Sequence, residues 1–270
     1  MKQVDGKLIV ITGGASGIGR LMALDFARRG ARLAVWDLNR AALDALEEEG
    51  RREGLAVAGT VCDVSRREEV YRAARELAGR WGVPDILVNN AGVVSGKTLL
   101  EADDGGIQKT LEVNVLSLFW TARAFLPAML ERKSGHIVTI ASAGGLIGVA
   151  GLADYCASKF AAVGFDESLR MELRRVKSPV RTTVICPFFI DTGMFAGIKT
   201  RFPLLLPVMK SEAAARRMVR AVLKNRRRFI LPFFARSVLL LRLFPPAALD
   251  AVADFFGLSH AMDNFTGRNQ

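Results

Sequence analysis

The chain has 270 residues, of which 50% are hydrophobic and 24% are charged. This composition is that of a folded protein and excludes a long disordered region, and a single domain over residues 1–270 is the simplest arrangement. Three separated cysteines and two histidines predict neither a disulfide framework nor a metal site, and they favour a reducing, cytoplasmic compartment.

The net charge of +11 arises from one part of the chain. Between Lys199 and Arg242 there are twelve basic residues and one acid, Glu212, whereas charges of the two signs balance elsewhere. The polar start, residues 1–7, predicts no signal peptide. The apolar run Phe229–Phe244 is broken by a proline and two arginines, which argues against a spanning helix but not against a position on a membrane surface.

Apolar runs rich in β-branched residues alternate with helical patterns along the chain. Helical spacing of apolar residues marks Ile18–Arg29, Arg66–Arg80, Gln108–Arg132 and Tyr155–Arg174. The alternation predicts a single-domain α/β protein with a Rossmann-type, doubly wound, mostly parallel sheet, whose ligands lie beyond the carboxyl ends of the strands. The seven predicted strands are Leu8–Thr12, Arg32–Trp36, Ala56–Cys62, Ile86–Asn89, His136–Ile140, Val180–Ile185 and Phe229–Leu231.

The first strand is followed by the turn Thr12-Gly13-Gly14-Ala15-Ser16-Gly17-Ile18-Gly19. Small residues at this point let backbone amides approach a pyrophosphate at the positive end of the next helix. Glycines also serve tight turns that bind no ligand, so the turn alone does not establish a nucleotide site.

Asp37 follows the second strand, where a carboxylate can accept hydrogen bonds from both ribose hydroxyls of adenosine and repel a 2′-phosphate. This favours NAD, although Arg20 and Arg40 keep NADP open as the less favoured coenzyme. Alternatively, Asp37 or Asn39 caps the helix that begins near Arg40. Two further strand ends carry Cys62-Asp63-Val64 and Asn89-Asn90-Ala91-Gly92, which serve either a nucleotide or a turn.

Ser142, Tyr155 and Lys159 carry the catalytic hypothesis. Tyr155 and Lys159 stand four apart, so on a helix they share a face and the ammonium can lower the pKa of the phenol. Such a tyrosine can exchange a proton with a substrate oxygen, to which Ser142 would donate a hydrogen bond. A Tyr and a Lys four apart also occur by chance, but their combination with the earlier motifs is far more specific.

Together these motifs resemble those of the short-chain dehydrogenase/reductase family over nearly the whole chain. The separations also match, with 13 positions from Ser142 to Tyr155 and 28 from Asn114 to Ser142. The resemblance implies that Tyr155 is the acid/base, that Lys159 holds the nicotinamide ribose and tunes Tyr155, and that Asn114 anchors a relay water. The implied coenzyme contacts are Gly13, Ser16, Gly17, Ile18, Gly19, Asp37, Asp63, Val64, Asn90, Ala91, Gly92, Tyr155, Lys159, Pro187, Ile190 and Thr192.

One departure is Pro187-Phe188 where the family commonly has Pro-Gly. This pair and segments such as Asp-Tyr-Cys-Ala-Ser-Lys-Phe at 154–160 resemble the epidermal retinol dehydrogenase and 17β-hydroxysteroid dehydrogenase 11/13-like branch. That branch oxidises lipophilic alcohols and associates with membranes or lipid droplets, usually through an apolar amino-terminal anchor that this sequence does not show.

The resemblance makes residues 192–250 the substrate-covering segment. Within it, Ser211 can cap an amphipathic helix that runs through Asn225, either facing the core with a solvated basic side or lying on a membrane. Peripheral contact with an anionic membrane through 199–244 is therefore a hypothesis, whereas no motif indicates specific nucleic-acid binding.

We therefore expect an NAD-dependent oxidoreductase that moves a hydride between nicotinamide and a lipophilic alcohol or carbonyl, such as a retinoid or steroid. Two alternatives stay open: a 3-oxoacyl or general carbonyl reductase with the same site chemistry, and a coenzyme-binding membrane or lipid-droplet protein without turnover. Helices 108–132 and 155–174 resemble the pair through which the family commonly associates, which implies a homodimer or homotetramer.

Overall fold

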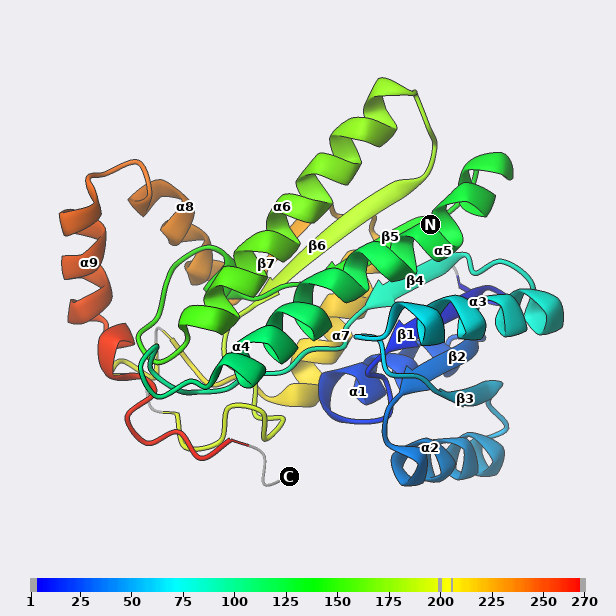
Figure 1. The fold of residues 1–270 in the computed structure, drawn as a ribbon, viewed down its shortest axis with the longest axis horizontal. Coiled ribbons are helices and arrows are strands. Elements are labelled where there is room, and N and C mark those ends of the chain that lie inside the picture. The colour runs from blue at the N-terminus through cyan, green and yellow to red at the C-terminus, as the bar shows by residue number, and fades with distance from the viewer. Residues whose placement is uncertain (1–3, 199–200, 205, 268–270) are drawn as a thin grey trace.

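A computed structural model describes residues 4–198, 201–204 and 206–267. Its seven-stranded sheet has the order β3-β2-β1-β4-β5-β6-β7, and every pairing is parallel (Figure 1). The predicted doubly wound fold is confirmed, and each predicted strand agrees within two residues at either end. The strands are β1 (Leu8–Thr12), β2 (Arg32–Asp37), β3 (Val57–Val61), β4 (Ile86–Asn89), β5 (His136–Ile140), β6 (Arg181–Pro187) and β7 (Arg228–Leu231).

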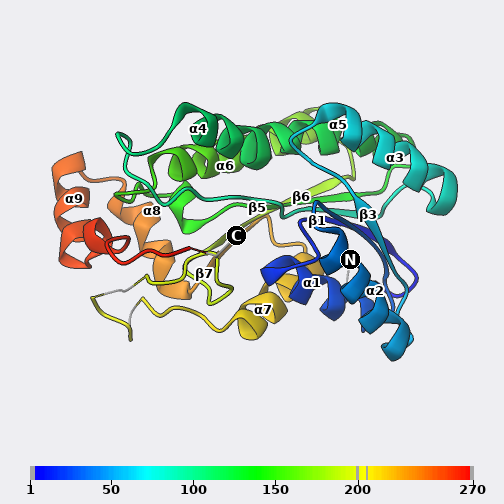
Figure 2. The same cartoon turned by 60° about the horizontal axis from the view of Figure 1, so that its bottom comes forward.

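Helices cover both faces of the sheet, as Figure 2 shows. One layer holds α1 (Gly17–Ala27), α2 (Arg40–Glu53) and α7 (Ser211–Leu223); the other holds α3 (Arg67–Trp81), α4 (Asp104–Leu111), α5 (Ser117–Glu131) and α6 (Ala153–Arg175). Each layer encloses its own core, with Phe26 and Met218 on the first side and Trp36 and Phe125 on the second. This double coverage explains why the strands are apolar on both faces.

The predicted helix Gln108–Arg132 is part of a longer helical stretch from Asp104 to Glu131. A π-helical turn, Glu112–Leu116, separates α4 from α5. By length and mean hydropathy this stretch could cross a membrane, but 44% of its most apolar window is buried inside the protein. Val113, Phe125 and Met129 belong to the core under it, so it serves here as a layer helix.

Two helix starts resolve the capping alternatives. Asn39 caps α2, because its side chain accepts a hydrogen bond from the Ala42 N–H at 3.0 Å. The prediction that Ser211 caps α7 was wrong: Ser211 is the first helical residue, and its N–H donates to the Asp191 carboxylate at 2.6 Å. A carboxylate from a distant loop thus replaces the hydroxyl at the positive helix end.

The amphipathic pattern of α7 serves the core. Its apolar side chains, including Met218 and Val219, are buried in the cluster that also contains α1, whereas Arg216 and Arg220 are exposed. The helix ends at Leu223, two residues before the predicted end. The first of the two readings, a core-facing helix with a solvated basic side, describes this segment.

Candidate active site

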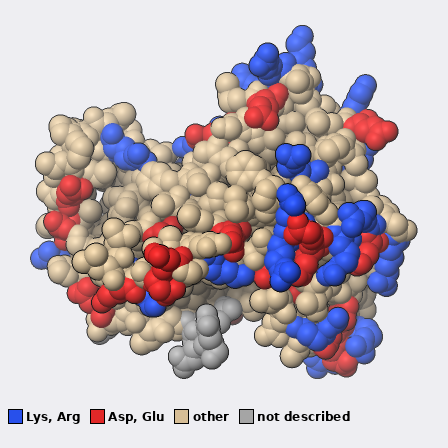
Figure 3. Space-filling model, in the orientation of Figure 1, with Lys and Arg blue, Asp and Glu red and all other residues tan. Residues whose placement is uncertain are grey.

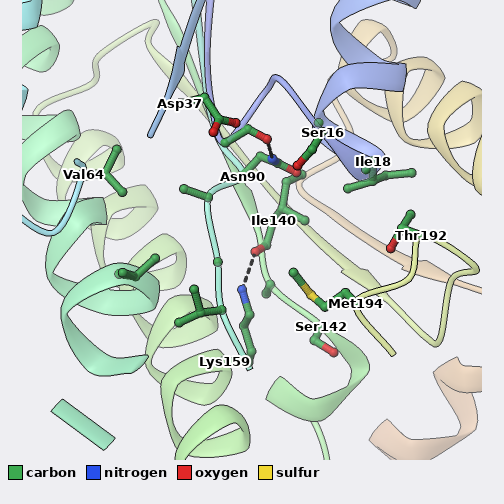
Figure 4. Close-up of a pocket in the computed structure, with 18 of the residues that line it drawn as sticks. Ser16, Ile18, Asp37, Val64, Asn90, Ile140, Ser142, Lys159, Thr192 and Met194 are labelled. Carbon is green, nitrogen blue, oxygen red and sulfur yellow. Dashed lines mark hydrogen bonds between the residues drawn. The ribbon is translucent and has the colours of Figure 1, made fainter. Parts of the chain in front are cut away.

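A cleft runs across the carboxyl ends of the strands, as the doubly wound topology requires. Figure 4 shows its lining, which combines the turn after β1 with the ends of β2, β4, β5 and β6. Every residue assigned to the coenzyme from sequence lines this cleft: Gly13, Ser16, Gly17, Ile18, Gly19, Asp37, Asp63, Val64, Asn90, Ala91, Gly92, Tyr155, Lys159, Pro187, Ile190 and Thr192.

The glycine turn is shaped by contacts that leave no room for side chains. Gly13 and Gly17 have positive φ angles of 60° and 53°, which favour glycine. A Cβ on Gly19 would collide with the Asn90 amide and the Gly13 carbonyl. The Asn90 side chain donates to the Thr12 and Gly13 carbonyls at 2.9 and 2.8 Å. Asn90 therefore braces the turn, and the turn leaves the space that a pyrophosphate beside backbone amides needs.

Asp37 lines the end of the cleft where adenosine was expected from the sequence. One carboxylate oxygen accepts from the Ala15 N–H at 3.0 Å, and the other from the Asn39 N–H at 3.1 Å. These bonds fix the carboxylate beside the glycine turn. The cap of α2 is Asn39 and not Asp37. Both arginines considered for a phosphate have acidic partners, Arg20 with Glu49 and Arg40 with Asp44.

A second acidic group lies farther along the same end. Asp63 accepts from the Ser65 hydroxyl at 2.6 Å and pairs with the Lys109 ammonium at 3.2 Å. Burial works to raise the pKa of Asp63, but these hydrogen bonds and the charge of Lys109 together hold it below its usual value. Lys109 reaches the cleft from α4, and no local motif in the sequence marked it.

Tyr155, Lys159 and Ser142 meet where the cleft is deepest. All three are buried, with relative exposures of 5%, 5% and 9%. The Lys159 ammonium donates to the Ile140 carbonyl at 3.2 Å (Figure 4). It lies 5.5 Å from the centre of the Tyr155 ring. The Ser142 hydroxyl oxygen accepts from the Gly144 N–H at 3.0 Å. Helix α6 thus presents the tyrosine and lysine on one face, opposite a serine held by the loop after β5.

Burial governs the protonation of this group in the protein alone. It raises the pKa of Tyr155, although the Ser142 hydroxyl acts in the opposite direction, and it lowers the pKa of Lys159 to about 8. In the protein alone, burial therefore raises the pKa of the tyrosine that Lys159 was expected to lower.

Asn114 lies behind the cleft and does not line it. Its amide is engaged with the protein: the oxygen accepts from the Val93 N–H at 2.8 Å, and the nitrogen donates to Ser158 and to the Val93 carbonyl, each at 2.9 Å. Asn114 sits in the π-helical turn, a local irregularity that often accompanies functional sites. Its oxygen and the Lys159 ammonium both lie beside Gly92.

A smaller apolar pocket adjoins the cleft and shares Tyr155 with it. Its polar side chains are Ser142 and Tyr155, and the rest of its lining is apolar or glycine: Ala143, Gly144, Ile147, Val149, Leu152, Phe188, Phe189, Phe195 and Leu258. Phe195 packs edge-on against Tyr155 and Phe189, with ring centres 5.5 and 5.3 Å apart. Ser142 and Tyr155 therefore line both the larger cleft and this apolar pocket.

The profile of the short chain dehydrogenase family matches residues 7–201 of the chain. The chain belongs to this family. Mouse epidermal retinol dehydrogenase 2 is 44% identical to this dehydrogenase, across 100% of the chain and 88% of the relative. Zebrafish retinol dehydrogenase 10-B is 40% identical, across 100% and 87%. The crystal structure of a Burkholderia phymatum short chain dehydrogenase/reductase in complex with NAD has a TM-score of 0.81 and 29% identity, covering 90% of this chain and 95% of that one.

The resemblance expected from the motifs is thereby confirmed, including its similarity to retinol dehydrogenases. The dehydrogenase is an oxidoreductase that acts on CH–OH groups. Where the family commonly has Pro-Gly, Phe188 lines both the cleft and the apolar pocket. The departure thus adds an aromatic ring at the junction of the two spaces.

The carboxyl-terminal segment of the dehydrogenase forms a wall of the site that no local motif predicted. Met262 and Phe265 belong to the apolar cluster that contains Tyr155 and Cys156. The Phe265 ring fills the space beside Gly96, where a Cβ would collide with it. The Thr266 N–H donates to the Ala196 carbonyl at 3.0 Å, which ties this segment to the loop that carries Phe195.

Proposed function

We propose that the dehydrogenase oxidises a lipophilic alcohol of the retinol type with NAD as its coenzyme. The observation that carries the proposal is that Ser142 and Tyr155 line both the cleft and the apolar pocket. A carbinol placed between them has its oxygen at the two hydroxyl groups and its hydrocarbon among aromatic and aliphatic side chains. A coenzyme held in the cleft would share Ser142 and Tyr155 with this substrate.

The residues divide the reaction between them. NAD bound in the cleft supplies a carbon that accepts the hydride from the carbinol. Ser142 donates a hydrogen bond to the substrate oxygen, and Tyr155 removes the hydroxyl proton as the carbonyl forms. Lys159 stabilises the phenolate and holds the nicotinamide ribose, while Asn114 fixes the strand end and helix around Lys159. The glycine turn holds the pyrophosphate.

NAD is preferred over NADP because of the charges at the adenosine end. Asp37 is the acidic group nearest the glycine turn, and a 2′-phosphate beside it would meet a carboxylate held by two backbone N–H groups. Arg20 and Arg40 are already paired with Glu49 and Asp44. Neither arginine is therefore free to offset that repulsion without giving up its partner.

The substrate class follows from the apolar pocket. No charged side chain lines the part of it that the structure describes, so an anionic or zwitterionic substrate would lose its hydration without a partner. Two similar proteins are named retinol dehydrogenases, which makes retinol the first substrate to test. Association through the exposed sides of α5 and α6, where Phe119 and Met171 are 42% and 58% exposed, belongs to the same proposal.

The test is oxidation of all-trans-retinol by NAD in mild detergent, with retinal quantified by chromatography. Tyr155→Phe removes one hydroxyl, and we expect it to lower kcat by about a thousandfold or more because no other group replaces the base. The chain has two tyrosines, so Tyr71→Phe on α3 makes the same chemical change outside the site and serves as the matched control.

The outcomes separate the alternatives. Retinal formation that depends on Tyr155 and not on Tyr71 supports the proposal. Turnover of short oxoacyl thioesters with NADPH, but not of retinol, would replace it by a carbonyl reductase. Tight binding of NADH without turnover of any alcohol, steroid or carbonyl would replace it by a coenzyme-binding protein.

A further inference from the structure

The fold divides the basic and apolar segment 199–244 between two ends of the molecule. Residues 199, 200 and 205 of this segment lie outside the described residues. The apolar side of α7 is buried, and Arg226 and Arg227 directly precede β7, so they lie at the amino edge of the parallel sheet, opposite the active site. The chain after β7 lies on the active-site side, as does the stretch from the loop around Phe202 to Met209, which pairs with Ile190 of the cleft. Most of the positive charge is therefore not where the exposed apolar residues are.

These exposed apolar residues form what we call the apolar cap, residues 233–256 together with 201–204. It comprises a short turn (Phe233–Arg236), α8 (Ser237–Leu241) and α9 (Pro246–Phe255), which project from one end of the body in Figure 1. Of the eighteen exposed large apolar side chains among the described residues, seven fall within 233–255. Leu243 and Phe244, between the two helices, are 81% and 61% exposed. Such clustering marks an interaction surface rather than scattered exposure.

Two of the three arginines of the cap lie over its aromatic rings, whereas Arg242 lies 5.0 Å from the Phe160 ring of α6 and donates to the Leu146 carbonyl. The Arg236 guanidinium is 5.0 Å from the centre of the Phe233 ring, and Arg201 is 5.6 Å from both Phe202 and Phe255. In this part of the protein three arginines face two aspartates, Asp250 and Asp254, and charged side chains are sparse on the corresponding end in Figure 3. At a lipid surface, apolar rings can enter the hydrocarbon layer while neighbouring guanidinium groups stay among the phosphates. The side chains of the cap have this arrangement.

The inner side of the cap continues into the active site. Val238 of α8, Leu249 and Ala253 of α9, and Phe256 directly after α9 pack against Ile147, Leu206 and Leu258. Ile147 and Leu258 in turn line the apolar pocket beside Tyr155. Two side chains of this pocket wall are therefore packed directly against the inner side of the apolar cap.

We propose that the apolar cap docks on a phospholipid surface and that lipophilic substrate enters the apolar pocket from that surface. The second half rests on the proposed function, whereas docking does not. Because the three arginines exceed the two aspartates by one charge, insertion of apolar side chains dominates the binding. The protein therefore binds neutral vesicles, and anionic lipid strengthens binding by less than about tenfold.

Vesicle flotation tests docking without any turnover. The full chain is floated with vesicles of phosphatidylcholine alone and of phosphatidylcholine with phosphatidylserine. The double variant Leu243→Glu/Phe244→Glu should reduce the bound fraction at least about tenfold, because two carboxylates would enter the apolar layer. The matched control is Leu99→Glu/Leu100→Glu, which adds the same charge to two adjacent exposed residues of the loop after β4, outside the apolar cap and outside the helices α5 and α6.

A second measurement separates docking from substrate chemistry. Retinol turnover is compared in detergent and in vesicles; the cap variant should retain detergent activity within about twofold and lose vesicle activity in parallel with binding. Absence of turnover by the unaltered protein in detergent would count against the proposed function only. Unchanged flotation of the cap variant would overturn docking through the cap. If the cap variant also changed its oligomeric state without losing flotation, the surface would instead be assigned to contact with another copy of the chain.

Discussion

The carboxylate of Asp154 accepts a hydrogen bond from the backbone N–H of Tyr155 at 2.7 Å. The same carboxylate accepts from the Ser95 hydroxyl at 2.9 Å and from the Thr110 hydroxyl at 2.8 Å. Asp154 is 9% exposed and forms no ion pair with any described residue, so these bonds and the positive end of α6 balance its charge. One buried group thus joins the loop after β4, helix α4 and the start of the helix that carries Tyr155.

Asp154→Ala should misplace Tyr155 without touching the coenzyme. We expect kcat to fall by about ten- to a hundredfold, because small displacements of a reacting group are costly, with little change in the KM for NAD. Stability should fall by about 1–3 kcal/mol, because two hydroxyls lose their acceptor. Asp154→Asn keeps one acceptor oxygen and should recover part of the loss in kcat. Equal kcat in the Ala variant and the unaltered protein would show that Asp154 serves stability alone.

Coenzyme choice should depend on Asp37. Asp37→Ala removes the repulsion of a 2′-phosphate, so the ratio of kcat/KM for NADP to that for NAD should rise by about tenfold or more. Asp44→Ala is the informative control, because it releases Arg40 from its ion pair and leaves Asp37 in place. If Asp44→Ala changes the ratio as much as Asp37→Ala does, then Arg40 rather than Asp37 determines the preference.

Lys159 should contribute to activity at the expense of stability. Burial lowers its pKa from 10.5 to about 8 in the folded protein. Between these two values the unfolded chain binds more protons, so the free energy of unfolding should rise with pH across this range and level off above it. Below pH 8 the full cost of the buried charge is present.

Lys159→Met removes this cost and should therefore raise the free energy of unfolding at pH 7 by about 1–3 kcal/mol while abolishing turnover. The gain should shrink as the pH approaches 10.5, the ordinary pKa of the lysine. Urea unfolding of both proteins at neutral and alkaline pH measures it. Lys109→Met, at an exposed lysine paired with Asp63, should show no such gain. A neutral-pH loss of stability in Lys159→Met would contradict the assignment.

Two glycine substitutions should have opposite effects. Gly19→Ala places a Cβ against the Asn90 amide and the Gly13 carbonyl, so it should weaken NAD binding about tenfold or more and destabilise the fold. Gly79→Ala, inside α3, meets no atom within 4 Å and should stabilise the protein by about 0.5–1 kcal/mol. Thermal unfolding with and without NAD distinguishes the two, and an unaltered NAD affinity in Gly19→Ala would remove the turn from the coenzyme site.

Local patterns in the sequence were sufficient for the sheet and for the cleft. The central strands are apolar runs buried on both faces, and most residues assigned to the coenzyme follow strand ends or start a helix. Because parallel strands bring their carboxyl ends to one edge, residues as distant as Asp37 and Thr192 come together once the strand order is known.

Features that depend on contacts between distant segments were not predictable in this way. The Asp191 carboxylate reaches the start of α7 across a loop, which no local capping pattern indicates. Phe195 and Phe265 are positioned by contacts between segments that are distant in the sequence. Phe265 packs beside Gly96 in the loop after β4, and both rings pack against the cluster that contains Tyr155. The π-helical turn that holds Asn114 leaves no mark in an otherwise regular helical period.

The three cysteines of the dehydrogenase are free and buried, and burial raises the pKa of each thiol. Cys62 lines the adenosine end of the cleft, Cys156 lies under Met262 beside Tyr155, and Cys186 is in the sheet. A thiol reagent can therefore label each one only when its surroundings open. The labelling rate of Cys62 would measure how often the cleft opens, and that of Cys156 how often the segment around Met262 opens. The labelling rate of Cys186 would measure how often the sheet itself unfolds. Saturating NAD should slow the labelling of Cys62.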